Sequence, residues 1–149
     1  MARLSPQNHL RLRQAMPGTL DVTFAGAEAN AAVAIAALGG RARLVTALPR
    51  NEIAEACCAA LRAAEVDVTH IVRSEAGRFG LYFVETGANQ RAGNVLYDRA
   101  DSAFSLAGPE AYPWNDSLNG AGWLHTTGIA AGVSRVAATA TLAAVRAAR

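Results

Sequence analysis

The sequence predicts an α/β fold in which helices cover a mostly parallel sheet and a small β hairpin stands apart from it. Strand-like and helix-like stretches alternate from residue 20 to residue 73, the pattern of parallel strands joined by right-handed crossovers. Two adjacent stretches between residues 78 and 99 then alternate apolar and polar side chains with no helix between them. At 149 residues the chain has the length of about one domain.

The alternating part of the chain begins with LDVTF, residues 20–24, which has the period of a half-buried strand. An alanine-rich helix follows within 25–40, and its two terminal glycines are typical of a helix end. Short apolar strands are predicted over 42–48 and 68–73. Between them, apolar residues recur at spacings of three and four along 51–64, which predicts a helix with one buried stripe: Ile53, Ala56, Cys57, Ala60, Leu61 and Ala64.

The hairpin is predicted from RFGLYFVE, residues 78–85, and GNVLYDR, residues 93–99, joined by a loop rich in turn residues. It spans about residues 80–99. LRLRQ, residues 10–14, also alternates, so the region 10–24 is a candidate for further strands of the same sheet.

After a proline-bearing loop over 107–122, the α/β pattern returns. WLHTTGI, residues 123–129, predicts a strand, and residues 134–149 predict a helix with Ser134 as its N-cap. That helix runs to Arg149 without the glycine or proline that usually closes a helix, and the first residues are strand-like at once. These two features lead us to expect a truncated domain.

The charge pattern excludes several classes of function. Fourteen basic and twelve acidic residues give a net charge of +2, spread along the chain without a run, which argues against nucleic-acid and membrane-surface partners. All basic residues are arginine. Without lysine, neither a Walker-type phosphate loop nor a Schiff-base aldolase is expected.

Cysteine and histidine usage indicates neither a disulfide nor a metal site. Cys57 and Cys58 are adjacent, a poor arrangement for a structural disulfide, and favour a reducing, cytoplasmic location. The histidines His9, His70 and His125 are scattered, so we assign no metal to them. No signal peptide and no apolar segment of about 20 residues is expected.

The stretch LYDRADSAFS contains the most informative pair of side chains. In a strand Tyr97 and Arg99 point to the same face, away from Asp98. A guanidinium beside a phenol suits a carboxylate ligand. The alternative is that Arg99 pairs with Asp98 or Asp101 at the surface while Tyr97 covers a sheet.

Several segments together resemble the ribokinase-like (PfkB) carbohydrate kinases, and most nearly the 2-dehydro-3-deoxygluconate (KDG) kinases. They occur in the family's order along essentially the whole chain: AGAEANAAVAIAALGG, LVTALPRNEIAEACCAALRAAEVDVTHIVR, GRFGLYFVETGANQR, NVLYDRADSAFS and WLHTTGI. The YDRADSAFS and LHTTGI segments are specific to acid-sugar kinases. The sequence departs from the family at Ala25, where a second glycine is common, and at LPRNEIA, which usually contains glycine and aspartate.

The resemblance implies a doubly wound α/β domain with a small β lid over the sugar. It implies that Gly26, Asn30, Tyr82, Tyr97 and Arg99 contact the substrate, with Arg99 on its carboxylate. Simpler interpretations stay open: Gly26 permits a tight turn, Asn30 caps a helix, and Tyr82 packs in the sheet. The implied activity is ATP- and Mg²⁺-dependent phosphorylation of KDG to its 6-phosphate. Homo-oligomers that pair through the lid are also implied.

The family's catalytic aspartate, in a glycine-alanine-glycine-aspartate motif, has no counterpart in residues 1–149. We therefore expect this chain to be the sugar-binding half of a kinase domain, with no catalytic residue of its own and no turnover when alone. Two alternatives remain: another ribokinase-like kinase of the fructokinase type, and a non-catalytic sugar-binding module that self-associates.

Overall fold

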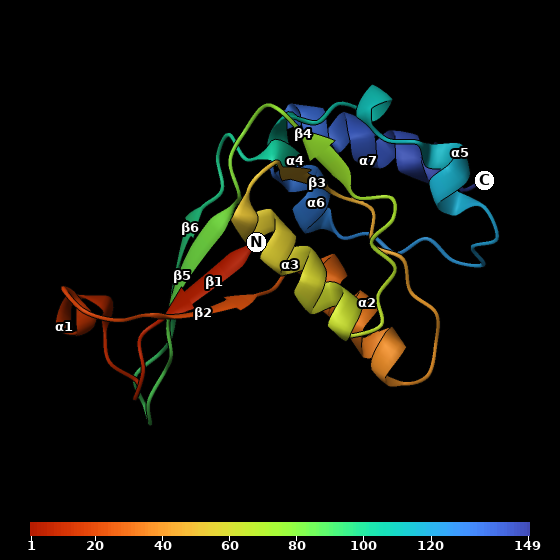
Figure 1. Ribbon diagram of the computed structural model, residues 1–149. Coiled ribbons are helices and arrows are strands. Elements are labelled where there is room, and N and C mark those ends of the chain that lie inside the picture. Colours follow the sequence, from red (N-terminus) through yellow and green to blue (C-terminus); the bar gives the residue numbers. More distant parts are fainter.

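The computed structural model describes residues 1–149, and Figure 1 shows a layered α/β body from which a sheet projects as an arm. The elements in chain order are β1 (Ala2–Ser5), α1 (Leu12–Ala15), β2 (Asp21–Phe24), α2 (Ala27–Ala37), β3 (Ala47–Pro49), α3 (Glu52–Ala63), β4 (Val72–Ser74), β5 (Leu81–Glu85), β6 (Asn94–Asp98), α4 (Ala103–Leu106), the 3₁₀ helix η1 (Pro109–Ala111), α5 (Trp114–Leu118), α6 (Gly128–Gly132) and α7 (Arg135–Ala147).

The body has three layers, with the parallel pair β3 and β4 in the middle. Leu48 packs into a core with residues of α2 and α3, whereas its neighbour Ala47 packs into a second core with Tyr112 and with Ala140 of α7. Consecutive strand residues point to opposite faces, so the two cores lie on opposite sides of the sheet. The predicted α/β class is confirmed by this arrangement.

The arm is a four-stranded sheet in the order β2-β1-β5-β6. Strands β5 and β6 form the hairpin predicted over residues 80–99, and they pair antiparallel. Strand β1 pairs parallel with β5 and antiparallel with β2. Residues 21–24 thus belong to the arm rather than to the layered body. We call this sheet, with β1, β2, β5 and β6, the arm sheet.

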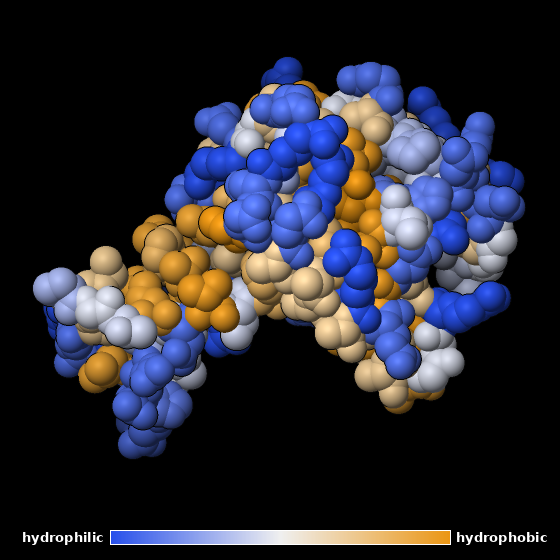
Figure 2. Space-filling model, in the orientation of Figure 1, coloured by the Kyte–Doolittle hydropathy of each residue, from blue (hydrophilic) through white to orange (hydrophobic).

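The two faces of the arm sheet differ in chemistry. Residues paired across strands share a face, so the register gives one ladder of polar and aromatic side chains: Thr23, Arg3, Tyr82 and Tyr97. The opposite face carries an apolar ladder: Val22, Leu4, Phe83 and Leu96. Figure 2 shows apolar atoms gathered over the arm, and Val22 and Leu96 are 59% and 56% exposed.

The helix predicted over 51–64 is confirmed as α3, and its N-terminus is capped as its sequence allows. The Asn51 side chain accepts a hydrogen bond from the Ala54 backbone N–H at 2.9 Å. The buried residues of α3 are Ala54, Cys57, Cys58 and Leu61. The predicted stripe is therefore right at Cys57 and Leu61 but wrong at Ile53, which is 48% exposed, and at Ala56 and Ala60. The cap at Ser134 is confirmed as well, since its Oγ accepts from the N–H of Ala137 at 2.9 Å.

We expect Asn51→Ala to lower the free energy of unfolding by about 1 kcal/mol, because the first turn of α3 loses its side-chain acceptor. Urea unfolding followed by circular dichroism measures the loss. The control Asn115→Ala alters an exposed asparagine in α5 for which no side-chain hydrogen bond is present, and it should change stability by less than half as much. Equal losses in the two variants would contradict the capping role.

Two predicted strands are wrong. Residues 10–14 do not form a strand: the chain turns into α1, whose first N–H, that of Leu12, donates to the Glu85 carboxylate at 2.9 Å. Residues 123–127 have no strand partner, and the hydroxyl of Thr127 accepts from the Ile129 N–H at 3.2 Å to begin α6. Periodicity alone does not form a strand, because the backbone groups need a partner strand.

Two further strands are shorter than predicted. The region 42–48 contributes β3 only from Ala47 onward, with an isolated bridge between Arg43 and Asp67 before it. The region 68–73 contributes β4 only from Val72 onward. The helix within 25–40 is α2, and Gly39 follows it with a φ of +81°, the left-handed region that favours glycine.

Candidate functional site

Strand β6 and the residue just after it carry the centre of the candidate site. The Arg99 guanidinium carbon lies 4.4 Å from the centroid of the Tyr97 ring, a cation–π contact. Tyr97 in turn stacks on Tyr82 of β5, with ring centroids 6.0 Å apart and planes at 29°. The register of β5 and β6 places the two tyrosines opposite each other. A cation and two phenols therefore form one continuous surface on the polar face of the arm sheet.

Arg99 makes no ion pair with a protein carboxylate. Asp98 lies on the other face of the strand and pairs with Arg78, whose Nη1 donates to its Oδ2 at 3.0 Å. The hydrogen bonds from Arg78 hold the pKa of the Asp98 carboxyl below its usual range. None of the four ion pairs involves Arg99 or Asp101, so the alternative that Arg99 pairs with Asp98 or Asp101 is wrong.

Gly26 and Asn30 lie at the start of α2 and contact each other. The Gly26 N–H donates to the Asn30 Oδ1 at a long 3.4 Å. Gly26 has a φ of 173°, which any residue adopts, and a Cβ there would meet the Ala29 Cβ at an ordinary 3.7 Å. The backbone conformation of the turn at Gly26 therefore does not depend on glycine. Asn30 does hold the first turn of α2, so its helix-stabilising role is present beside any role in binding.

A cleft of about 1230 Å³ brings parts of the site together. Gly26, Asn30 and Arg99 all line it, as do Gly80 and Thr126. Tyr82 and Tyr97 are not among its lining residues, and they extend the site along the arm sheet. The structure therefore joins the start of α2 to the end of β6 around one opening.

Glu28 and Thr127 are contacts of this region that the sequence reasoning missed. The Glu28 Oε1 accepts from the Thr127 hydroxyl at 2.6 Å and from the Thr127 N–H at 3.1 Å. These bonds tie the start of α2 to the start of α6. The available signals were an acidic residue in the first turn of one helix and a threonine N-cap before another, but nothing local indicates that the two meet.

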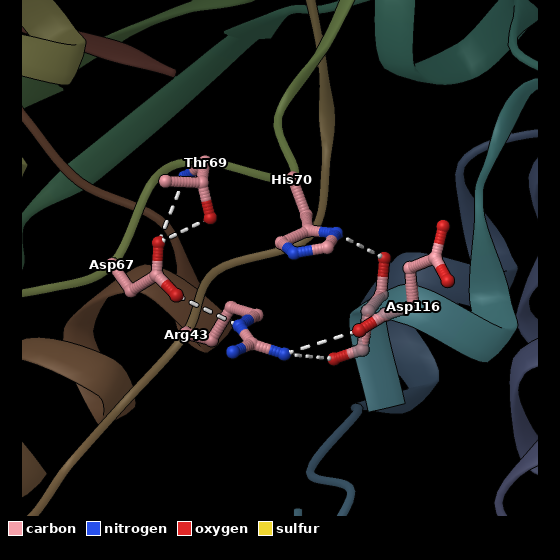
Figure 3. A network of polar contacts seen from close by, with 6 residues as sticks. Arg43, Asp67, Thr69, His70 and Asp116 are labelled. Carbon is pink, nitrogen blue, oxygen red and sulfur yellow. Dashed lines mark hydrogen bonds and ion pairs between the residues drawn. The ribbon is translucent and has the colours of Figure 1, made fainter. Parts of the chain in front are cut away.

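A second polar network lies away from the arm sheet (Figure 3). The Arg43 Nε pairs with the Asp67 Oδ2 at 2.8 Å, and its Nη1 donates to the backbone carbonyls of Asp116 and Ser117. Thr69 donates to the Asp67 Oδ1 through its hydroxyl at 2.6 Å and through its N–H at 2.9 Å. This network joins the segment before β3, the segment before β4 and α5.

The hydrogen bond from the Thr69 hydroxyl, helped by the Thr69 N–H and by Arg43, lowers the pKa of Asp67 to about 2. A depressed pKa in the folded state stabilises the fold above the unfolded-state pKa of 3.8. The contribution is lost as the pH falls from about 4 toward 2. Because the Asp67 side chain is 35% exposed, solvent screening leaves about 1 kcal/mol of this contribution.

We therefore expect Asp67→Asn to cost about 1 kcal/mol of unfolding free energy at pH 7, and less as the pH falls below 4. Denaturant unfolding at pH 7, 4 and 3 measures the difference from the unchanged chain. Glu75→Gln removes the carboxylate of an exposed pair with Arg50 and should cost less at pH 7. A cost for Asp67→Asn that stays constant down to pH 3 would contradict the assignment.

The remaining reactive side chains form no further centre. Cys57 and Cys58 are free and buried, and burial raises the pKa of both thiols. No three His, Cys, Asp or Glu side chains converge as metal ligands. None of the helices is long and apolar enough to cross a lipid bilayer.

Comparison with known proteins gives a family match that covers most of the chain. Residues 8–149 match the family described as pfkB family carbohydrate kinase. The 2-dehydro-3-deoxygalactonokinase of Haloferax volcanii is 34% identical over 134 residues, which are 90% of this chain and 41% of that protein.

Solved structures of sugar kinases also have folds similar to that of this chain. The crystal structure of 2-dehydro-3-deoxygluconokinase from Thermotoga maritima has a TM-score of 0.94 and 40% identity, over 99% of this chain and 44% of its own. Fructokinase from Xylella fastidiosa has a TM-score of 0.65 and 26% identity, over 79% of this chain and 38% of its own. The chain thus spans less than half the length of the relatives it matches.

Proposed function

Because this chain belongs to the pfkB family of carbohydrate kinases, we propose that it is the sugar-binding part of an enzyme that phosphorylates an acid sugar. The proposed substrate is 2-dehydro-3-deoxy-D-gluconate (KDG), and the product is its 6-phosphate. The observation that carries the proposal is Arg99, a cation without an ion pair that lies over the Tyr97 ring and lines the cleft.

The reason for an acid substrate is the state of Arg99. A guanidinium that has no protein carboxylate but lies on an aromatic face is available for a bidentate contact with a ligand carboxylate. A neutral hexose would give this cation no charged partner. Both relatives named above as deoxy-sugar kinases act, by their names, on sugars of this acid class. The proposed carboxylate contact uses the group that such sugars share.

In this proposal the other site residues carry no charge and contact the uncharged parts of the sugar. The hydroxyls of Tyr82 and Tyr97 orient the sugar along the arm sheet, which acts as the lid. At the start of α2, Gly26 leaves room for the sugar to approach the backbone, and the Asn30 amide contacts its hydroxyls. ATP and Mg²⁺ serve the whole enzyme, and we assign neither to residues of this chain. Two free thiols favour a reducing compartment, so the proposal places the enzyme in the cytoplasm.

The proposal includes self-association through the apolar ladder of the arm sheet. Val22, Leu4, Phe83 and Leu96 lie in register on one face, and two of them are more than half exposed. An ordered apolar ladder on a sheet face fits a second copy of the same ladder, related by a two-fold axis.

Calorimetry tests the proposed function directly. The 149-residue chain is titrated with KDG, with D-fructose and with 3-deoxy-D-fructose, the analogue in which a neutral hydroxymethyl group replaces the carboxylate. We expect KDG to bind most tightly. Tighter binding of D-fructose would favour a fructokinase-type substrate instead, and absence of binding to all three would contradict a sugar-binding role.

A coupled ADP-release assay with KDG, ATP and Mg²⁺ completes the test. We expect binding without turnover, because phosphoryl transfer needs a positioned base and phosphate-binding groups together with the sugar. Asp98, the acid nearest Arg99 in the chain, lies on the opposite face of β6 and is paired with Arg78. Turnover that persists after removal of contaminating host kinase would contradict the view that this chain supplies only the sugar site.

A further inference from the structure

Arg3 lies on β1 in the same ladder as the two tyrosines. The register aligns Arg3 with Tyr82 on one side and with Thr23 on the other, and Tyr82 is aligned with Tyr97. Aligned residues of neighbouring strands share a face. The polar face of the arm sheet therefore carries a cation on each side of the tyrosine pair, with Arg3 beside Tyr82 and Arg99 over Tyr97.

The Arg3 guanidinium has no protein partner. Its Nε is buried without a hydrogen bond, and it takes part in none of the four ion pairs. A buried donor left unpaired is costly, and native proteins seldom keep one without a ligand, a water or an ion to satisfy it. Arg73 also has one buried unpaired nitrogen, but its guanidinium is already held by the Glu55 carboxylate.

We propose that Arg3 is a further sugar-binding residue that donates to hydroxyl or carbonyl oxygens at the end of the ligand remote from its carboxylate. This inference rests on the proposed function. Neighbouring strands lie about 4.8 Å apart, so Arg3 and Tyr97, two strands apart, are separated by about 10 Å. A ligand carboxylate bound to Arg99 is too far from Arg3 to contact both arginines. The rest of the six-carbon chain of the same ligand is long enough to extend toward Arg3.

Removal of Arg3 and removal of Arg99 should therefore change ligand affinity in different ways. Arg99 binds the carboxylate, which only the acid sugar has. Arg3 meets oxygens that the acid sugar and its neutral analogue share, through hydrogen bonds strengthened by the charge of the donor. Loss of Arg3 therefore weakens both ligands by the same factor, and loss of Arg99 weakens KDG alone.

The test compares Arg3→Met, which keeps the apolar stem and removes the donors, with Arg3→Lys, which keeps the charge. Calorimetry with KDG and with 3-deoxy-D-fructose should show about tenfold weaker binding of both ligands to Arg3→Met, with partial recovery in Arg3→Lys. The melting temperature of Arg3→Met should not fall, because the removed donor has no partner in the protein. Arg13→Met, at an exposed arginine of α1, should leave binding unchanged.

Each outcome decides the matter. Unchanged affinity in Arg3→Met, or a loss matched by a fall in melting temperature, overturns the role of Arg3. If Arg99→Ala weakens KDG while Arg3→Met does not, the proposed function stands and this inference fails. If the unchanged chain binds neither ligand, the proposed function fails, and the inference about Arg3 fails with it.

Discussion

The Arg99→Ala variant should bind KDG about 30-fold more weakly than the unchanged chain, a loss of about 2 kcal/mol that is typical of a hydrogen bond to a charged group. The variant removes the cation that lies 4.4 Å from the Tyr97 ring centroid and has no carboxylate partner in the protein. Calorimetry on the folded variant measures the loss. Binding of the neutral analogue 3-deoxy-D-fructose should change by less than threefold.

Two further variants separate charge from geometry. Arg99→Lys keeps the charge but not the planar fork, so it should recover only part of the KDG affinity. Arg146→Ala removes an exposed arginine from the last turn of α7 and should leave both ligands unaffected. Equal losses for the acid sugar and its neutral analogue in Arg99→Ala would show that Arg99 does not bind the carboxylate.

The Leu96→Glu variant should raise the dissociation constant of the proposed dimer by 100-fold or more. Leu96 is 56% exposed at the end of the apolar ladder. In a two-fold dimer each substitution places a carboxylate against the apolar face of the partner, and an unpaired charge buried in this way is costly. The loss corresponds to about 2.7 kcal/mol or more.

Sedimentation velocity across a range of protein concentrations measures this effect. Leu142→Glu is the matched control, because Leu142 is an exposed leucine of similar exposure, 49%, on α7 of the layered body. It should leave the dimer intact. A monomeric unchanged chain at micromolar concentration, or equal dissociation in both variants, would show that the apolar ladder is not the interface.

The sequence predicted most accurately what depends on near neighbours in the chain. The apolar spacing along 51–64 predicted α3, and the serine at the start of the last helix predicted its cap. The hairpin over 80–99 was predicted from two alternating stretches and a turn-rich loop, and it is present as β5 and β6. In each case the decisive contacts lie within a few residues or across one short loop.

The sequence misled where the same local pattern needed a distant partner. LRLRQ alternates like a strand and WLHTTGI was predicted to be one, yet neither region forms a strand. Leu12 instead donates to Glu85, which is remote in the chain, and Thr127 binds Glu28 and caps α6. Membership of a sheet depends on which backbone lies alongside, and the period of one segment does not contain that information.

In the candidate site, too, some features follow from the local sequence and others depend on distant partners. That Tyr97 and Arg99 share a face and Asp98 does not follows from the two-residue period of a strand, and the sequence by itself determined it. Whether Arg99 would be paired with an acid was decided only by the tertiary structure, in which Asp98 pairs with Arg78 on the far side of β6. The position of Arg3 beside Tyr82 was also decided there, because the parallel pairing of β1 with β5 joins strands that are far apart in the chain. Local geometry sets the direction of each side chain, but its partner depends on long-range packing.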